Sequence, residues 1–218
     1  MGQRICKTLA YVLFWYRDII LIKTKTTIQT DFSWVHKLKF KEHADKDLSG
    51  YVDAIAIKSE SGSVYDFYRS DPVEKPKNFK YTQLYDKIPE AKLLTDFYEI
   101  ETTRIRIHKQ DPGKTIPLHV DGNNTYAKTN EDYRLRMITA LTSSVDFIYT
   151  FEYNNETIEY QLKDGESIIF DPDLVKHGMK NKSKTKTRYA LVQVFKAYPV
   201  TEWMKNFINK KETVILWI

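Results

Sequence analysis

The chain has 218 residues, of which 42% are hydrophobic and 29% charged, so it has enough apolar residues for a folded core and lacks the bias of disordered or collagen-like chains. Its one cysteine, Cys6, excludes internal disulfides and cysteine-based zinc or iron–sulfur centres, and we expect a reducing compartment, the cytoplasm. The formal net charge of +5 is mildly basic and by itself indicates no nucleic-acid partner.

The first hundred residues read as a mixed α/β segment. Leu9–Ile22 is strongly apolar, but it is shorter than the roughly 20 residues that a membrane-spanning helix needs, so we expect a buried element and no membrane span. Alternation predicts strands at Tyr51–Lys58 and Ser63–Tyr68, and the 3.6-residue pattern predicts a helix at Pro89–Tyr98.

From Glu101 onward the pattern changes to short β-like runs separated by turn signals, which is typical of a sandwich or barrel. The runs are Thr102–Lys109, Tyr133–Thr142, Val145–Tyr153, Thr157–Leu162, Ser167–Phe170 and Thr187–Lys196. Gly165 predicts a tight hairpin between the fourth and fifth runs, because such a turn needs a positive φ.

The end of the chain reads differently. Thr201–Glu212 has an amphipathic helical pattern, whereas the apolar Thr213–Ile218 indicates no particular element. We therefore expect one domain over 1–218, made of an α/β extension at 1–100, a mainly β core at 101–196 and a helix with a tail at 197–218.

Three residues of the second half have the chemistry of a metal site. On a strand, His119 and Asp121 point to the same side, so they can hold one ion together, and His177 from a distant run can complete the set. Two imidazoles and one carboxylate on one face leave the opposite positions open, as in non-heme Fe(II) oxygenases that admit a cosubstrate and O2. Zinc also accepts these ligands, so the metal stays open at this point.

Arg188 favours the oxygenase among these alternatives. It lies on the β run that follows His177, and its guanidinium can pair with a carboxylate through two hydrogen bonds, which a lysine does not reproduce. A cofactor with two carboxylates can bind the metal at one end and this arginine at the other. 2-Oxoglutarate is such a cofactor.

Four segments together resemble the aspartyl/asparaginyl β-hydroxylase-like family of Fe(II)/2-oxoglutarate-dependent oxygenases. They are IPLHVDG (116–122), RLRM (134–137), GESIIFDPDLVKHGMKN (165–181) and RYALVQVF (188–195), and their order and spacing are more specific than any single motif. The resemblance implies a cupin-type double-stranded β-helix, or jelly roll. It also implies that His119, Asp121 and His177 bind Fe(II) and that Arg188 binds the distal carboxylate of 2-oxoglutarate.

The chain differs from parts of that family at two positions. Some members have glycine where Asp121 stands, and because a halogenating oxygenase generally needs this position vacated for halide, the complete triad favours hydroxylation. Ile138 follows RLRM where the animal enzymes carry a histidine that helps to hold the cosubstrate. The resemblance therefore implies that Arg188 carries more of that role here.

Alternation along the strands also predicts three candidate substrate or cosubstrate contacts, Arg106, Arg134 and Arg136. The loop that follows Asp121 adds Asn123 and Tyr126. Arginines that face a barrel mouth suit a carboxylate-bearing substrate, and the loop after Asp121 is rich in polar residues that can contact a ligand.

The expected function is therefore hydroxylation of an unactivated C–H bond, with 2-oxoglutarate and O2 as cosubstrates and succinate and CO2 as products. The resemblance suggests a free amino acid, or an Asp- or Asn-type side chain of a protein, as substrate. One alternative is a metal-dependent cupin isomerase or hydrolase that does not use 2-oxoglutarate. Another is a non-catalytic module that binds nucleic acid through the lysines of Lys180–Lys186, but such runs are usually solvated turns. The sequence does not indicate an oligomeric state.

Overall fold

The computed structural model describes residues 21–24, 30–42, 51–66, 78–96, 101–121, 134–153, 155–173, 175–196 and 213–216. The larger of its two sheets contains β1 (Leu21–Thr24), β2 (Lys41–Glu42), β3 (Asp53–Ser59), β4 (Lys80–Tyr81), β5 (Thr102–Gln110), β7 (Arg134–Ala140), β10 (Ser167–Phe170), β12 (Arg188–Lys196) and β13 (Thr213–Leu216). The smaller sheet contains β6 (Thr115–His119), β8 (Phe147–Tyr153), β9 (Glu156–Tyr160) and β11 (Lys176–Asn181). The described helices are the 3-10 helix η1 (Ser33–Lys37), α2 (Gln83–Lys87) and α3 (Pro89–Asp96).

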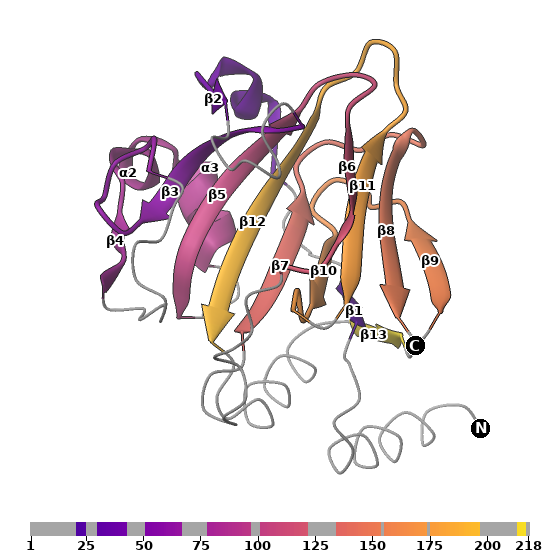
Figure 1. Cartoon of the computed structure of the whole chain (residues 1–218). Coiled ribbons are helices and arrows are strands. Elements are labelled where there is room, and N and C mark those ends of the chain that lie inside the picture. Colours follow the sequence, from indigo (N-terminus) through magenta and orange to yellow (C-terminus); the bar gives the residue numbers. More distant parts are fainter. Residues whose placement is uncertain are drawn as a thin grey trace, which may run out of the picture.

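Both sheets are antiparallel, and they face each other as the two walls of an open barrel (Figure 1). The larger sheet has the order β13-β1-β10-β7-β12-β5-β3-β2, with β4 paired to β3, and the smaller sheet has the order β6-β11-β8-β9. From β5 to β12 the chain passes repeatedly from one sheet to the other. This crossing pattern is that of a double-stranded β-helix, which confirms the predicted mainly β, cupin-type core.

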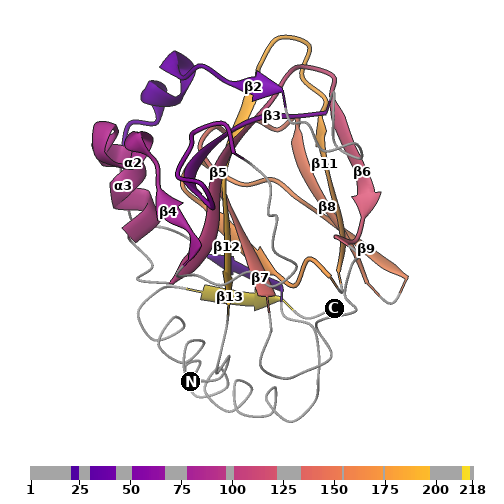
Figure 2. The same cartoon turned by 60° about the vertical axis from the view of Figure 1, so that its left-hand side comes forward.

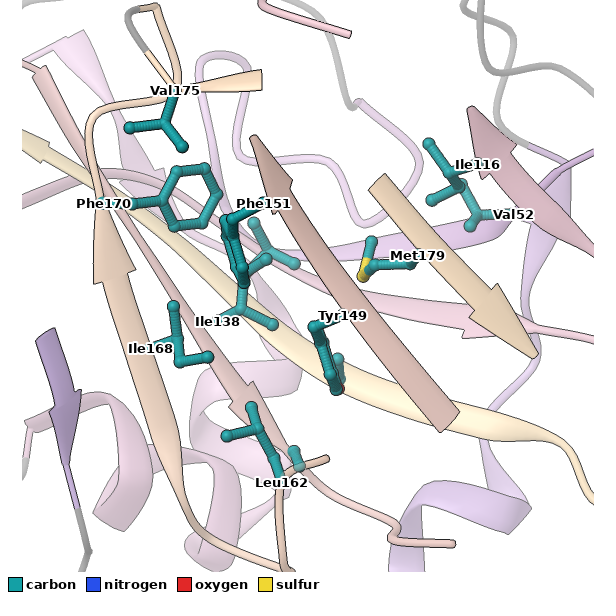
Figure 3. Close-up of a cluster of buried hydrophobic side chains, with 13 residues drawn as sticks. Val52, Ile116, Ile138, Tyr149, Phe151, Leu162, Ile168, Phe170, Val175 and Met179 are labelled. Carbon is teal, nitrogen blue, oxygen red and sulfur yellow. The ribbon is translucent and has the colours of Figure 1, made fainter. Parts of the chain in front are cut away.

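The barrel core lies between the two sheets. Figure 3 shows Ile138, Ile168 and Phe170 of the larger sheet packed toward Tyr149 and Phe151 of the smaller one. Strand alternation explains this arrangement, because every second residue of a strand points to the same face. In β12, Ala190 and Val192 face this interior, while Tyr189 and Leu191 pack on the other side.

A second apolar layer covers the opposite face of the larger sheet. Figure 2 shows η1, α2 and α3 on the side of that sheet away from β8 and β11. Val35 of η1 and Leu94 of α3 pack there against Ile55, Ile107 and Leu191 of the sheet. The central strands are therefore buried on both faces, which is why β12 reads as a nearly continuous apolar run.

Most of the predicted elements are confirmed with small shifts in their ends. The helix predicted at Pro89–Tyr98 is α3, and the strand predicted at Tyr51–Lys58 is β3. The six predicted β runs correspond to β5, β7, β8, β9, β10 and β12. The sequence pattern did not indicate η1, β2 or β4, and the six runs did not include β6 or β11, although His119 was expected to lie on a strand.

The strand predicted at Ser63–Tyr68 is wrong in its described part, because residues 63–66 form a turn. Gly62 has a φ of 80°, and the Ser61 hydroxyl accepts a hydrogen bond from the Ser63 backbone N–H. The Asp66 carboxylate accepts another from the Ser61 N–H. These local bonds stabilise a turn in place of the alternating strand.

The hairpin predicted around Gly165 is also wrong, although the glycine does have a positive φ of 77°. The turn joins β9 of the smaller sheet to β10 of the larger sheet, so the two strands are not paired with each other. A local turn signal contains no information about which sheet each flanking strand enters.

The two ends of the chain lie largely outside the described residues. Of the apolar Leu9–Ile22 segment, the structure describes only Leu21 and Ile22, which begin β1. The helix predicted at Thr201–Glu212 lies outside the described residues, whereas the unassigned tail supplies β13, which pairs with β1. Among the described helices, none has the length and apolar character needed to cross a membrane. The division at residues 100 and 196 stays a prediction.

Candidate metal centre

Strand pairing brings the two predicted histidine ligands together. His177 of β11 lies directly opposite His119 of β6 in the antiparallel register, and the two ring centroids are 4.5 Å apart. The register shifts between His177 and Met179, and Gly178 lies in this irregular stretch. A Cβ atom on Gly178 would lie 2.9 Å from the Ile116 carbonyl oxygen, so only glycine lets β6 approach this closely.

Asp121 completes the group just beyond the end of β6. Its backbone N–H donates to the Pro172 carbonyl at 2.9 Å, which fixes the chain next to the loop before β11. Its Oδ1 atom lies 3.5 Å from His119 Nε2 and 3.6 Å from His177 Nε2. The three candidate ligand atoms all lie within 4.8 Å of one another. The structure therefore brings together all three predicted metal ligands.

The backbone fixes the orientation of both imidazole rings. His119 Nδ1 lies 2.8 Å from the Pro117 carbonyl oxygen, and His177 Nδ1 lies 3.0 Å from the Val175 carbonyl oxygen. A carbonyl only accepts, so each Nδ1 carries a proton, and Nε2 is the nitrogen that has the lone pair when the ring is neutral. Metal-binding histidines commonly donate their second N–H to a backbone carbonyl in this way, which sets the tautomer and ring orientation.

The protonation states also suit a metal. Burial lowers the pKa of His177, because the charged imidazolium is disfavoured there, so its Nε2 is free of a proton at neutral pH. Burial by itself would raise the pKa of Asp121, but Arg136, His119 and His177 together hold it well below its usual range. The hydrogen bond with Asp121 raises the pKa of His119. The site thus contains an ionised carboxylate and a neutral imidazole.

Arg136 of β7 also reaches this cluster. Its Nη1 atom lies 3.0 Å from His177 Nε2 and 3.4 Å from Asp121 Oδ1, and its Nη2 donates to Asp121 Oδ2. β7 belongs to the larger sheet, so this side chain crosses the barrel interior to the ligands of the smaller sheet. Sequence reasoning placed Arg136 among the candidate substrate contacts and gave no indication of its bonds with two metal ligands.

Arg188 lies deeper in the same interior and is only 1% exposed. Its Nε donates to Gln110 Oε1 at 2.9 Å, and its Nη1 donates to the Tyr149 hydroxyl at 3.1 Å. Its Nη2 atom is buried and has no hydrogen-bond partner. A buried guanidinium with an unsatisfied donor is costly, and an anion that accepts from Nη2 would satisfy it.

The pairing of β8 with β11 gives the separation between the metal ligands and the Arg188 environment. His177 lies opposite Phe151, and Met179 lies opposite Tyr149, the residue that binds Arg188. Tyr149 is therefore two residues along the strand from the level of His177, which corresponds to about 6.6–6.8 Å. The two imidazole nitrogens and the carboxylate oxygen of the triad fit a metal ion. The unpaired Nη2 donor of Arg188 fits the distal carboxylate of a short dicarboxylate. The chain thus has suitable groups for Fe(II) and 2-oxoglutarate.

The structure describes only some of the other predicted substrate or cosubstrate contacts. Arg106 is 6% exposed and lies opposite Val192, on the inner face of the larger sheet. Ile138 lies on the other side of Val192, 2% exposed, so the position at which the animal enzymes carry a histidine is apolar here. Arg134 begins β7, but its side chain lies outside the described part of the structure. Asn123 and Tyr126 also lie outside the described residues.

Sequence reasoning missed two residues of the Arg188 environment, Gln110 and Tyr149. Gln110 is the last residue of β5 and faces Arg188 directly in the register, whereas Tyr149 comes from the other sheet. Alternation indicated which residues of one strand share a face. Alternation does not indicate which strands pair, and this pairing brings Gln110 and Tyr149 to Arg188.

The lysine run of the nucleic-acid alternative is largely exposed. Lys180 at the end of β11 forms an ion pair with Glu159 at 3.5 Å, and Lys182, Lys184 and Lys186 are exposed near the turn before β12. This arrangement is that of a solvated turn.

No protein-family model matches the sequence, and no curated protein matches it. Among solved structures, the non-heme α-ketoglutarate-dependent epimerase SnoN from nogalamycin biosynthesis is similar over 86% of this chain and 82% of that chain, with 11% identity and a TM-score of 0.50. An oxidoreductase of the 2OG-Fe(II) oxygenase family from Burkholderia pseudomallei covers 72% of each chain with 14% identity and a TM-score of 0.48. A prolyl-4-hydroxylase from Pseudomonas putida covers 81% of this chain and 91% of that chain with 10% identity and a TM-score of 0.47.

At these identities the likeness to SnoN concerns the fold. It agrees with the double-stranded β-helix that the strand order defines. The narrower resemblance to aspartyl/asparaginyl β-hydroxylases rests on the sequence motifs alone.

Proposed function

We propose that the protein is an Fe(II)- and 2-oxoglutarate-dependent oxygenase that hydroxylates an unactivated C–H bond. The observation that carries this proposal is the buried Arg188, whose Nη2 donor has no partner, in the same barrel interior as the His119, Asp121 and His177 triad. The triad by itself suits several metal enzymes. A metal centre together with a buried, unsatisfied guanidinium suits a metal with a dicarboxylate cosubstrate.

Each part of the site has a defined task. His119, Asp121 and His177 would hold Fe(II) on one face, and Arg188, oriented by Gln110 and Tyr149, would bind the distal carboxylate of 2-oxoglutarate. When bound, iron and cosubstrate supply the oxidising power of O2, with release of succinate and CO2.

Apolar side chains pack beside the metal ligands. Phe170 packs on the His177 ring with centroids 4.8 Å apart, and Phe151 packs on Phe170 with centroids 5.0 Å apart. Ile138 lies in the same cluster. These apolar walls limit water around the metal ligands, which strengthens electrostatic interactions inside the site.

The proposed substrate is an amino acid, or an Asp- or Asn-type side chain of a protein. Arg106 and Arg136 support this choice, since both are arginines of the larger sheet whose side chains are mostly buried and reach the barrel interior. Arg134, Asn123 and Tyr126 remain candidate contacts. The resemblance to the aspartyl/asparaginyl β-hydroxylase-like family agrees with a carboxylate- or amide-bearing substrate, and the complete triad favours hydroxylation. We expect action in the cytoplasm and no nucleic-acid partner.

The competing function is that of a metal-dependent cupin that isomerises or hydrolyses its substrate without 2-oxoglutarate. Conversion of 2-oxoglutarate to succinate by the purified protein with Fe(II) and O2 separates the two. The wild type should form succinate slowly even without substrate, and Arg188→Leu should lose most of this turnover while still binding the metal. Lys180→Gln on the exposed end of β11 is the matched control and should behave as the wild type. No succinate from either protein would favour the metal-only enzyme, whereas equal succinate formation by wild type and Arg188→Leu would contradict the role of Arg188 in binding the cosubstrate.

A further inference from the structure

We propose that Arg136 competes with the metal ion for its ligands, so that metal binding requires the guanidinium to leave His177. This inference rests on the metal centre proposed above. Arg136 is not one of the three metal ligands, but it is bonded to two of them.

His177 has a single lone pair to offer. Its Nδ1 carries the proton that is donated to the Val175 carbonyl at 3.0 Å, so Nε2 is the only nitrogen of the ring that can bind a metal. Arg136 Nη1 lies 3.0 Å from that same Nε2. A guanidinium has donors only, so it occupies this lone pair. One lone pair cannot serve Arg136 and a metal ion at once.

Asp121, in contrast, has enough lone pairs to bind a metal ion and Arg136 at the same time. A carboxylate has about four lone-pair sites on its two oxygens, and Arg136 approaches both Oδ1 and Oδ2. Asp121 can therefore bind a metal through one oxygen and keep a hydrogen bond to Arg136 through the other. The conflict lies at His177, and after metal binding Arg136 becomes a positioning residue that orients the Asp121 carboxylate.

The same bonds stabilise the folded protein. The Asp121 side chain is 17% exposed and that of Arg136 is 12% exposed, so each would be a poorly compensated charge without the other. Removal of the guanidinium should therefore have two effects of opposite sign. The protein should become less stable without metal, and it should bind metal more tightly. A residue with only a structural role would show the first effect without the second.

The test is titration of the full chain with Co(II) alone, monitored by the visible absorption of the bound ion, without 2-oxoglutarate. Arg136→Leu removes the guanidinium and introduces no new ligand atom. We expect at least tenfold tighter Co(II) binding by this variant than by wild type, together with a lower midpoint of thermal unfolding without metal. Lys180→Gln, which removes a positive charge from the same strand as His177, should stay within twofold of wild type.

Arg136→Lys separates competition from simple charge repulsion, and it also serves if the leucine variant does not fold. Lysine keeps the positive charge, but its single ammonium cannot contact both Asp121 oxygens and His177 in the way that the guanidinium does. Competition predicts at least threefold tighter Co(II) binding by this variant. Affinities of Arg136→Lys and wild type that are equal would overturn the proposal, as would weaker binding by Arg136→Leu. Absence of Co(II) binding in every form, wild type included, would instead overturn the metal centre itself.

Discussion

His119 and His177 are 58 positions apart in the sequence, yet they lie directly opposite each other on β6 and β11, with ring centroids 4.5 Å apart. Both rings donate Nδ1–H to the carbonyl of the residue two positions earlier, Pro117 and Val175. The two rings are therefore held by the same kind of backbone hydrogen bond, and the strand register places them opposite each other.

The close approach of β6 to β11 depends on Gly178. In Gly178→Ala the new Cβ would lie 2.9 Å from the Ile116 carbonyl oxygen and 3.2 Å from the Leu118 nitrogen, so the strands must separate. We expect the free energy of unfolding to fall by about 1–3 kcal/mol, as for other overpacked sites. Because His177 precedes the glycine, we also expect roughly tenfold weaker Co(II) binding.

Gly113→Ala is the control for this variant. Its Cβ would meet no atom within 4 Å, but the φ of 74° disfavours alanine, so a loss of about 1 kcal/mol in stability is expected. Its Co(II) affinity should stay at the wild-type value. If both alanine variants bind Co(II) like the wild type, Gly178 does not position the ligands.

Each of the three ligands should be needed for metal binding. Replacement of His119, Asp121 or His177 by alanine removes one donor of a three-residue set, and we expect Co(II) affinity to fall at least 100-fold in each case. Metal content after dialysis, measured by atomic emission, checks this prediction. A variant that retains the wild-type metal content would show that the replaced residue is no ligand.

The Arg188 environment should control 2-oxoglutarate affinity and leave metal affinity unchanged. Arg188→Lys loses the planar fork that reaches Gln110 and Tyr149 together, and we expect at least tenfold weaker 2-oxoglutarate binding to the Co(II)-loaded protein by calorimetry. Tyr149→Phe removes only the hydroxyl that orients the guanidinium, so a smaller loss is expected. An Arg188→Lys protein with wild-type 2-oxoglutarate affinity would contradict the assignment.

Lys109 gives a prediction about stability and pH outside the metal centre. Burial by itself would lower the pKa of Lys109, but hydrogen bonds and ion pairs with Asp111 and Asp53 raise it overall. A raised folded-state pKa gives a stabilisation that is present below the unfolded pKa of about 10.4 and is lost as the pH rises through the folded pKa. Lys109→Met should therefore lower stability by about 0.5–1 kcal/mol at pH 7, since the side chain is partly exposed.

Urea denaturation of wild type and Lys109→Met at pH 7 and at pH values above 10.5 measures this difference. The gap between the two proteins should shrink at alkaline pH. A gap that stays constant or widens would show that the ion pairs of Lys109 do not cause the difference.

The sequence allowed prediction of those features that depend on spacing within one segment. His119, Asp121, His177 and Arg188 could be identified because each lies in a short motif whose order and alternation are visible locally. The structure brings the first three within 4.8 Å of one another and buries Arg188.

Features that depend on pairing between distant strands could not be predicted in this way. Gln110 and Tyr149 contact Arg188 from β5 and β8, and only the three-dimensional register places them there. Arg136 contacts the metal ligands because β7 lies across the barrel from β6 and β11. β6 was absent from the six predicted runs because it is short and contains Pro117, a residue that strands usually avoid.

The most direct test of the central claim is anaerobic titration of the purified apoprotein with Fe(II) and then with 2-oxoglutarate, monitored in the visible spectrum. The account predicts a weak metal-to-ligand charge-transfer band in the wild type, produced when 2-oxoglutarate chelates the iron, and no band in His177→Ala. Tight Fe(II) binding by the wild type without any such band would contradict the 2-oxoglutarate assignment and favour the metal-only cupin.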